Sequence, residues 1–205
     1  VFIEDAGDDE TAANISRRRL KVPASVAAFG ALAYSSTTPW FAPAGFERGS
    51  LDNVRGTEIR LNSSDRDILY EARINPIASF PNSQFVIFGQ KTTQIPRTAL
   101  DRVNVRRLMI NIKRKISVIA QSLLFSQNDQ QTRTNFIDRA NIELVYLLQN
   151  EGIEDYRVIM DDTNNSAEDV DNNRLNGKIV IVPTRAIEFI AIDFIITNSG
   201  VEFPS

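Results

Sequence analysis

The chain has 205 residues, 42% of them hydrophobic, and its 23 basic and 26 acidic side chains give a formal net charge of −3. This length suggests one or two domains, and the small net charge indicates no extended field for a polyanionic partner. Cysteine and histidine are both absent, which excludes disulfides, thiolate nucleophiles, histidine general bases and the usual Cys/His zinc sites.

Residues 1–21 are mostly polar and charged, and they lack the basic start and apolar run of a signal peptide. No window of the sequence approaches the roughly 20 apolar residues of a membrane span. The chain begins with Val1 rather than methionine, so we expect a fragment or a processed chain. Residues 1–21 are predicted to be an arm or the remnant of a preceding domain.

Residues 22–34 are rich in small apolar side chains, and Pro23 stands at a plausible first helical position, so a helix is predicted. Residues 39–49 are rich in proline and glycine. We expect them to form an ordered loop pinned by Trp40, Phe41 and Phe46.

A short helix is predicted to run to Arg73, capped by Ser63 or Ser64. Two strands are expected at residues 77–80 and 85–88, joined by a Pro-Asn-Ser turn. Residues 89–96 form a polar connector and are the most plausible internal boundary.

The strongest helix signal covers residues 101–125, where apolar side chains recur three and four positions apart. A second helix is predicted to start at Asn128 or Asp129 and to end at Gly152 in a left-handed cap. Three further strands are expected, at residues 156–160, 178–182 and 187–197. The fold class predicted from this order is α+β: a mixed β-sheet covered by helices, with two long helices inserted between strands.

The polar stretch 161–173 invites comparison with a calcium loop. Asp169, Asp171 and Asn173 have the first three spacings of such a loop. However, Arg174 stands where glycine is needed and Val180 where a bidentate glutamate is needed. A solvated turn explains the stretch better than a metal site.

The sequence gives as little support for a catalytic site as for a metal site. Asp161 and Asp162 are adjacent, so on a strand they would point to opposite faces and could not share a substrate. The glycines lack the spacing of a phosphate-binding loop. We therefore expect no enzyme activity, no metal and no cofactor.

A group of basic residues lies on the first long helix. At about 100° per residue, Arg107 and Arg114 fall opposite the apolar seam and the others flank it. The stripe is either a solvated surface or a docking surface for an acidic protein or nucleic acid. An overall pI of about 5.1 and the lack of aromatic side chains within the stripe favour a protein partner. The docking candidates are Arg102, Arg106, Arg107, Lys113 and Arg114.

The last predicted strand is apolar on both faces, interrupted by Glu188 and Asp193. Such a strand is either a central strand of the chain's own sheet or one that completes the sheet of another subunit. The candidates for inter-subunit contacts are Ile187, Phe189, Ile190, Ile192, Phe194 and Ile196.

Taken in order, several motifs resemble the phage contractile tail sheath protein family over residues 22–203. No single motif is specific, but their order is. The motifs are Asp-Arg-Val-Asn-Val-Arg-Arg-Leu at 101–108, residues 69–77 and 88–92, the Pro-Trp-Phe-Ala-Pro-Ala-Gly loop at 39–45, Asp-Thr-Asn-Asn at 162–165, and residues 183–194.

The resemblance implies a structural subunit of the virion that is assembled in the host cytoplasm. Such subunits polymerise as a helical cylinder around a tail tube and contract without nucleotide hydrolysis to drive the tube through the host envelope. Residues 22–95 would be the C-terminal part of the sheath middle domain, and residues 96–205 the C-terminal domain beside the tube. Chain-terminal arms would supply strands to neighbouring subunits.

The implied partners are other copies of the chain, the tail tube protein, and the baseplate and tail terminator proteins. Direct nucleic-acid binding and membrane insertion are not expected. The sequence does not separate a phage sheath from the sheath of a related contractile injection system. A nucleic-acid-binding module and, after it, a hydrolase are the alternatives from other classes.

Overall fold

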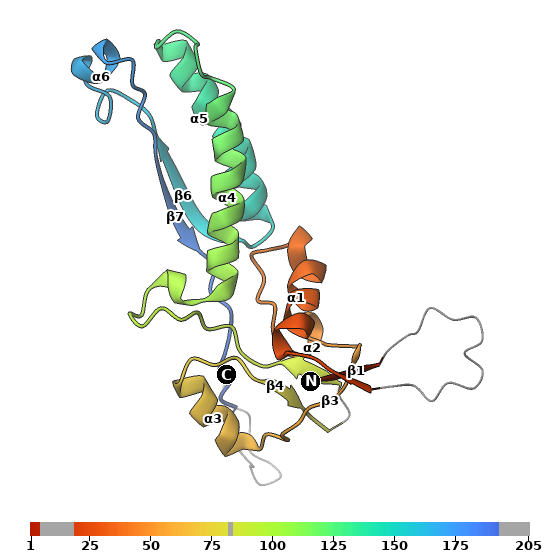
Figure 1. The fold of residues 1–205 in the computed structure, drawn as a ribbon. Helices are drawn as coiled ribbons and strands as arrows, with labels where there is room; N and C mark the ends of the chain where they lie inside the picture. Colours follow the sequence, from red (N-terminus) through yellow and green to blue (C-terminus); the bar gives the residue numbers. More distant parts are fainter. Residues whose placement is uncertain (5–18, 82–83, 193–205) are drawn as a thin grey trace, which may run out of the picture.

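The computed structural model of the chain describes residues 1–4, 19–81 and 84–192. Figure 1 shows an elongated molecule with two parts, joined where the chain leaves the lower part and returns to it. We name its parts as follows: the base (described residues up to 88), the connector (89–102), the arm (103–183) and the C-terminal segment (184–192).

The base combines short strands with short helices. Its antiparallel sheet has the order β2-β1-β3, and β4 and β5 form a separate antiparallel pair. The strands are β1 (Phe2–Glu4), β2 (Arg19–Lys21), β3 (Val54–Gly56), β4 (Ile77–Ser79) and β5 (Phe85–Ile87). The helices are α1 (Ala24–Tyr34), η1 (Ser35–Thr37), α2 (Gly45–Arg48) and α3 (Ser63–Glu71). A core of Ala31, Leu51, Val54 and Ile87 holds them together.

Two strands of the base lie within residues 1–21, where none was predicted. Ile3 in β1 lies opposite Leu20 in β2 and Val54 in β3, and it packs against the core of the base. Strands of three residues are too short to display the two-residue alternation that identifies a strand in a sequence.

The arm is a pair of long helices with a β-hairpin packed along them (Figure 1). After η2 (Ala99–Asp101) in the connector, its elements are α4 (Val103–Gln121), α5 (Gln130–Gln149), β6 (Ile153–Ile159), α6 (Ala167–Asp171) and β7 (Lys178–Pro183). Trp40 of the base enters the arm's main core, which therefore also joins the two parts. That core consists of Trp40, Leu108, Ile112, Leu144, Leu147 and Ile153.

The two long helices were predicted, with small differences at their ends. α4 begins after the expected start because Arg102 is extended, with φ −114° and ψ 142°. The Asp129 side chain caps α5 by accepting from the Thr132 amide at 2.8 Å. None of the described helices is both long enough and apolar enough to cross a bilayer.

The left-handed residue after α5 is Glu151, with φ 59°, and not Gly152 as predicted. The Glu151 amide donates to the Leu148 carbonyl and the Gly152 amide to the Leu147 carbonyl, which is a Schellman motif. Gly152 is needed for a different reason. A Cβ on it would lie 3.1 Å from Cγ of Trp40, so the glycine lets the chain pass close to the indole.

Two local predictions in the base were also wrong. The cap of α3 is Asn62, which exchanges hydrogen bonds with Asp65 in a capping box, rather than Ser63 or Ser64. In the 39–49 loop, Trp40 is 6% exposed, whereas Phe46 is 58% exposed and does not pin the loop. Phe46 packs instead against the ring of Phe80, with 5.1 Å between ring centroids.

The α+β class is confirmed, but the mixed sheet is not found among the described residues. Their strands form three small sheets, all antiparallel. The strands of the arm lie alongside the long helices, at a distance from the strands of the base, and the two groups belong to separate sheets (Figure 1).

Candidate functional site: an anchor for the C-terminal segment

The C-terminal segment runs from the end of β7 back past the connector to the base (Figure 1). A strand was predicted at residues 187–197, but residues 187–192 join no β-ladder in the described structure. Phe194 and Ile196 lie outside the described residues. Apolar side chains of the described part face solvent: Ile187 is 81%, Phe189 78%, Ile190 78% and Ile192 67% exposed.

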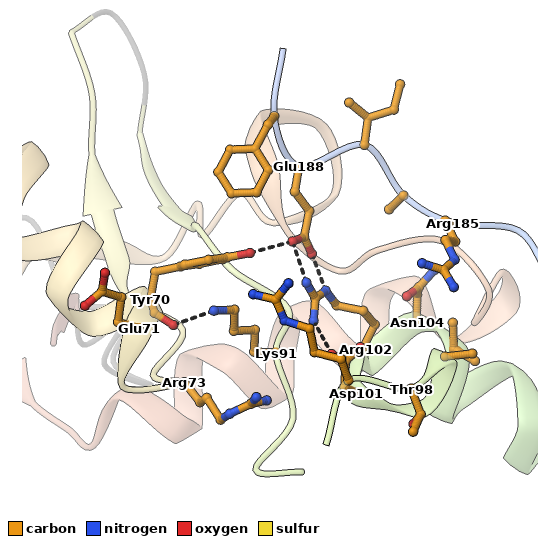
Figure 2. Close-up of a pocket in the computed structure, with 16 residues that line it drawn as sticks. Tyr70, Glu71, Arg73, Lys91, Thr98, Asp101, Arg102, Asn104, Arg185 and Glu188 are labelled. Carbon is orange, nitrogen blue, oxygen red and sulfur yellow. Dashed lines mark hydrogen bonds and ion pairs between the residues drawn. The ribbon is translucent and has the colours of Figure 1, made fainter. Parts of the chain in front are cut away.

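One side chain of this segment, Glu188, is held firmly against the body of the protein. Arg102 binds its carboxylate in a two-point fork, from Nε at 2.6 Å and from a terminal nitrogen at 2.9 Å. The Tyr70 hydroxyl donates to the same carboxylate at 2.8 Å, and the Gln90 amide does so at 3.4 Å. Figure 2 shows Tyr70 of α3 and Arg102 of the connector converging on Glu188. We call the three donors and Glu188 the carboxylate clamp.

The backbone on either side of Arg102 fixes its direction. Arg102 is the extended residue between η2 and α4, and its second terminal nitrogen lies 3.0 Å from the carboxylate of Asp101. The Val103 amide donates to the Gln90 carbonyl at 2.8 Å, and the Thr92 amide to the Asp101 carbonyl at 2.9 Å. The connector therefore folds back on the start of α4 and places Gln90 beside Arg102.

Tyr70 is positioned by the end of α3. Arg73 adopts φ 61° immediately after the helix, and its guanidinium donates to the carbonyls of Gln94 and Ile95. The Lys91 ammonium donates to the Tyr70 carbonyl at 2.6 Å and lies 3.1 Å from the centroid of the Tyr70 ring. These contacts connect α3 to the connector and hold Tyr70 next to Glu188 (Figure 2).

The electrostatics of the clamp favour an ionised Glu188. Burial acts most strongly on Glu188 and opposes ionisation, but hydrogen bonds from Arg102 and Tyr70 outweigh it and hold the pKa below its ordinary value. Burial, followed by the hydrogen bond to Glu188, raises the pKa of Tyr70. Burial, followed by the charge of Arg102, lowers the pKa of Lys91.

The clamp lies in a cleft of about 810 Å³ at the junction of base, connector and C-terminal segment. Cationic side chains outnumber acidic ones along its walls. The cations are Arg73, Lys91, Arg97, Arg102 and Arg185, and the acids are Glu71, Asp101 and Glu188. The cleft is thus suited to binding a carboxylate.

The basic stripe predicted on α4 is not one continuous surface. Arg102 belongs to the clamp, and Arg106 donates to the carbonyl of Leu100 and the side chain of Gln94. Among the predicted docking residues within the described structure, Lys113 and Arg114 are exposed and make no hydrogen bond or ion pair.

Arg107 was expected on the side of α4 opposite the apolar seam, and at this position that side is covered by the end of α1. Its guanidinium donates to the Ser35 hydroxyl at 2.8 Å and to the Leu32 carbonyl at 2.9 Å. These bonds bring the end of α1 against α4, and a helical wheel of α4 alone cannot show that the position is covered.

The polar stretch 161–173 is organised by amide side chains. Asn165 is 4% exposed; its amide donates to the Asp161 and Asn176 carbonyls, and its oxygen accepts from the Asn176 amide. Asp169 caps α6 together with Ser166. No group of three or more acidic side chains that could hold a metal occurs within the described ranges.

Sequence reasoning missed the clamp itself. Glu188 was noted only as an interruption of an apolar strand, and Tyr70 and Gln90 only as members of motifs. The available signal was Glu188, an acidic residue near the start of an otherwise apolar stretch, because a carboxylate away from the surface usually has a specific partner.

Comparisons with known proteins agree with the resemblance found in the sequence. A family model described as the phage tail sheath C-terminal domain matches residues 96–197. Over 85% of its length the chain is 36% identical to the tail sheath protein of Vibrio phage KVP40. Over 93% of its length it is 32% identical to that of Enterobacteria phage T4. The chain spans 26% and 29% of the length of these two relatives.

The fold matches a solved sheath. The PVC sheath complex of an extracellular contractile injection system, in the contracted state, superposes with a TM-score of 0.80. The match covers 87% of this chain and 52% of that one at 23% identity, so it supports a shared fold. Sequence and fold comparisons agree, and the chain belongs to the phage tail sheath protein family.

Proposed function

We propose that this chain is part of the structural subunit of a contractile phage tail sheath. The subunit polymerises around the tail tube and contracts to drive the tube through the host envelope for genome ejection. The observation that carries the proposal is the identity to curated tail sheath proteins over 85–93% of this chain. The described site supports it, because the clamp holds a peptide segment and provides no arrangement suited to catalysis.

The proposed partners are other copies of the subunit, the tail tube protein, and the baseplate and tail terminator proteins. Assembly would take place in the host cytoplasm and yield a virion component. Energy would be stored in subunit packing, with no nucleotide, cofactor or metal involved.

For the tube, we propose contact through Lys113 and Arg114, the exposed part of the α4 stripe. An exposed ion pair is worth about 0–1 kcal/mol, but a helical polymer repeats the contact in every subunit. Many weak contacts would hold the extended sheath and still permit release ring by ring. In the described structure, Arg102, Arg106 and Arg107 are engaged within the subunit, so they contribute to this surface less directly.

For the neighbouring subunit, we propose that the C-terminal segment and the residues after it add a strand to a sheet edge. Burying a large apolar side chain is worth about 1.5–3 kcal/mol, and Ile187, Phe189 and Ile190 are all exposed here. The β6–β7 pair is two-stranded in the described structure, so each strand has one open edge. A donated strand would satisfy both partners.

A sheath subunit of a contractile injection system is the second candidate, favoured by the superposition on the PVC sheath. The two candidates share the polymer and differ in the particle that carries it. Electron microscopy of particles from cells that produce the full-length protein with its tube would distinguish them.

The test of the sheath proposal is truncation of the full-length protein after Thr184. We expect the loss of long tubes in negative-stain images, with little change in the melting temperature of the subunit. Contractile tubes of normal length from the truncated protein would show that the segment does not join subunits. Failure of the intact protein to polymerise on its tube would reject the sheath function.

A further inference from the structure

We propose that the cleft around Arg102 is a binding site for a carboxylate on an extended peptide, and that Glu188 is its occupant in the isolated subunit. The site is a receptor formed by the base and connector rather than an ordinary surface ion pair. The chemistry of the site stands independently of the sheath function, and only its consequence for assembly rests on that function.

The receptor groups are held in place by contacts that do not involve the C-terminal segment. The Arg102 guanidinium forms an ion pair with the Asp101 carboxylate at 3.0 Å. The Val103 amide holds the backbone of Gln90 by donating to its carbonyl at 2.8 Å. Tyr70 is held at the end of α3, where Lys91 binds its carbonyl. Donors arranged before the ligand arrives bind a carboxylate with less loss of conformational entropy.

The donor set matches a carboxylate in particular. The planar guanidinium of Arg102 presents two N–H groups to the two oxygens of Glu188, a geometry that a lysine could not reproduce. Tyr70 adds a hydroxyl to one oxygen and Gln90 an amide N–H to the other. Both oxygens are therefore recognised, and the Glu188 side chain is only 19% exposed.

The occupant is held by few contacts besides its carboxylate. Within residues 184–192 the backbone donates one hydrogen bond to the arm, from the Thr184 amide to the Gly152 carbonyl at 3.3 Å. Beyond it, the Glu188 bonds and the edge-on packing of Phe189 against Tyr70, at 5.8 Å, are the described contacts. The segment can therefore leave the cleft without disrupting a β-ladder.

The empty receptor would attract another acidic group. Arg185 and Glu188 belong to the segment and would depart with it. The walls that remain carry the cations Arg73, Lys91, Arg97 and Arg102 against the acids Glu71 and Asp101. Arg97 makes no hydrogen bond or ion pair among the described residues, so its charge is available to a ligand.

For assembly, the clamp would control the direction in which the C-terminal segment extends from the subunit. While Glu188 is bound, the segment is fixed along the connector, and its exposed apolar side chains lie at a defined position on the surface of the subunit. After release, the same residues could reach over a much wider range. The clamp thus determines where the chain that follows can meet a neighbour.

The first experiment measures the backbone order parameters of the C-terminal segment in the 205-residue chain by ¹⁵N relaxation. In Glu188→Gln, we expect the order parameters of residues 186–191 to fall from about 0.85 to below about 0.6. Arg102→Met should have the same effect, whereas Arg114→Met on the exposed face of α4 should have none. Unchanged order parameters in both clamp variants, with circular dichroism showing an intact fold, would overturn the proposal.

The second experiment supplies the ligand as a separate peptide. A peptide of residues 184–192 is titrated into the Glu188→Gln chain, whose own segment no longer fills the cleft. We expect shifts of the Tyr70 and Gln90 resonances, and affinity at least about tenfold weaker for the peptide carrying glutamine instead of Glu188. Adding Arg102→Met to the receptor should abolish the preference. Equal binding of both peptides would overturn the proposal.

Neither experiment requires polymerisation. If both give the expected results and the full-length protein forms no tubes, the sheath function is rejected and the carboxylate site stands. If the full-length protein forms tubes and both experiments fail, only the site is rejected.

Discussion

Arg107 of α4 donates to both polar groups of Ser35, to the hydroxyl at 2.8 Å and to the carbonyl at 3.0 Å. Because Ser35 follows the last residue of α1, this contact ties the arm to the base. The guanidinium also binds the Leu32 carbonyl, so a single cation contacts two carbonyls at the end of α1, where the helix dipole favours a positive charge. Burial at this junction lowers the pKa of Arg107.

Replacing Arg107 with methionine should destabilise the protein. The carbonyls of Leu32 and Ser35 would lose a charged donor, and a loss of this kind costs about 1–3 kcal/mol. For a chain of this size, each kcal/mol lowers the melting temperature by about 2–4 °C. Arg114→Met, on the exposed face of the same helix, is the matched control and should have almost no effect. Equal melting temperatures for the two variants would contradict a structural role for Arg107.

Charge reversal at Lys113 and Arg114 should affect assembly without affecting the fold. Both side chains are exposed, and surface substitutions usually change stability by less than about 0.5 kcal/mol. We expect Lys113→Glu with Arg114→Glu to melt like the parent and to assemble poorly on purified tubes. The deficit should shrink as salt is raised if it arises from repulsion by an acidic tube surface. Normal assembly of the double variant at low salt would rule out this surface as the tube contact.

Gly152→Ala should distort the core at the junction of the two parts. The new Cβ would meet Trp40 Cγ at 3.1 Å and the Leu147 carbonyl at 3.3 Å, and overpacking of this kind costs about 1–3 kcal/mol. Trp40 is the sole tryptophan, so its fluorescence reports the change directly. Gly30→Ala in α1 is the control, because nothing lies within 4 Å of its Cβ position and alanine should stabilise the helix by about 0.5–1 kcal/mol. An unshifted emission spectrum and melting temperature for Gly152→Ala would show that the indole has room to move.

The 161–177 region should depend on Asn165 and not on calcium. Asn165→Ala removes bonds that join Asp161 to Asn176, and leaving such buried groups unpaired costs about 1–3 kcal/mol. A chelator should leave the melting temperature of the parent unchanged. A fall of several degrees with chelator that calcium reverses would instead establish a metal site.

Acid should release the C-terminal segment. The bound pKa of Glu188 lies below its ordinary value of 4.5, so the clamp contributes its full stabilisation above about pH 4.5. That contribution is lost as the pH falls through the lowered pKa, because the protonated carboxyl cannot accept the Arg102 fork. Order parameters of residues 186–191 should therefore stay constant from pH 7 to about 5 and fall at more acidic pH. A midpoint near or above the ordinary carboxyl value would contradict stabilisation of the ionised form.

The features predicted correctly are those that a short stretch of sequence determines by itself. α4 and α5 follow from apolar side chains three and four positions apart. The second helix was expected to start at Asn128 or Asp129, and the structure has Asp129 as its cap. The clamp and the Arg107 contact could not be predicted in this way. Arg107 and Ser35 are 72 positions apart, and their meeting depends on how α1 packs over α4. Gly152 shows an intermediate case, since the turn was located correctly but the need for glycine comes from Trp40.

The separation of Arg102 and Glu188 along the chain has a consequence for the order of folding. Their contact closes a loop of 86 residues, and closing such a loop in an unfolded chain opposes the contact by roughly 4 kcal/mol of entropy. Once α4, α5 and the β6–β7 hairpin have formed, both ends of that loop already lie at the junction with the base, and most of this opposition is gone. We therefore expect the C-terminal segment to be placed late in folding and to be the first described part to detach in native-state fluctuations.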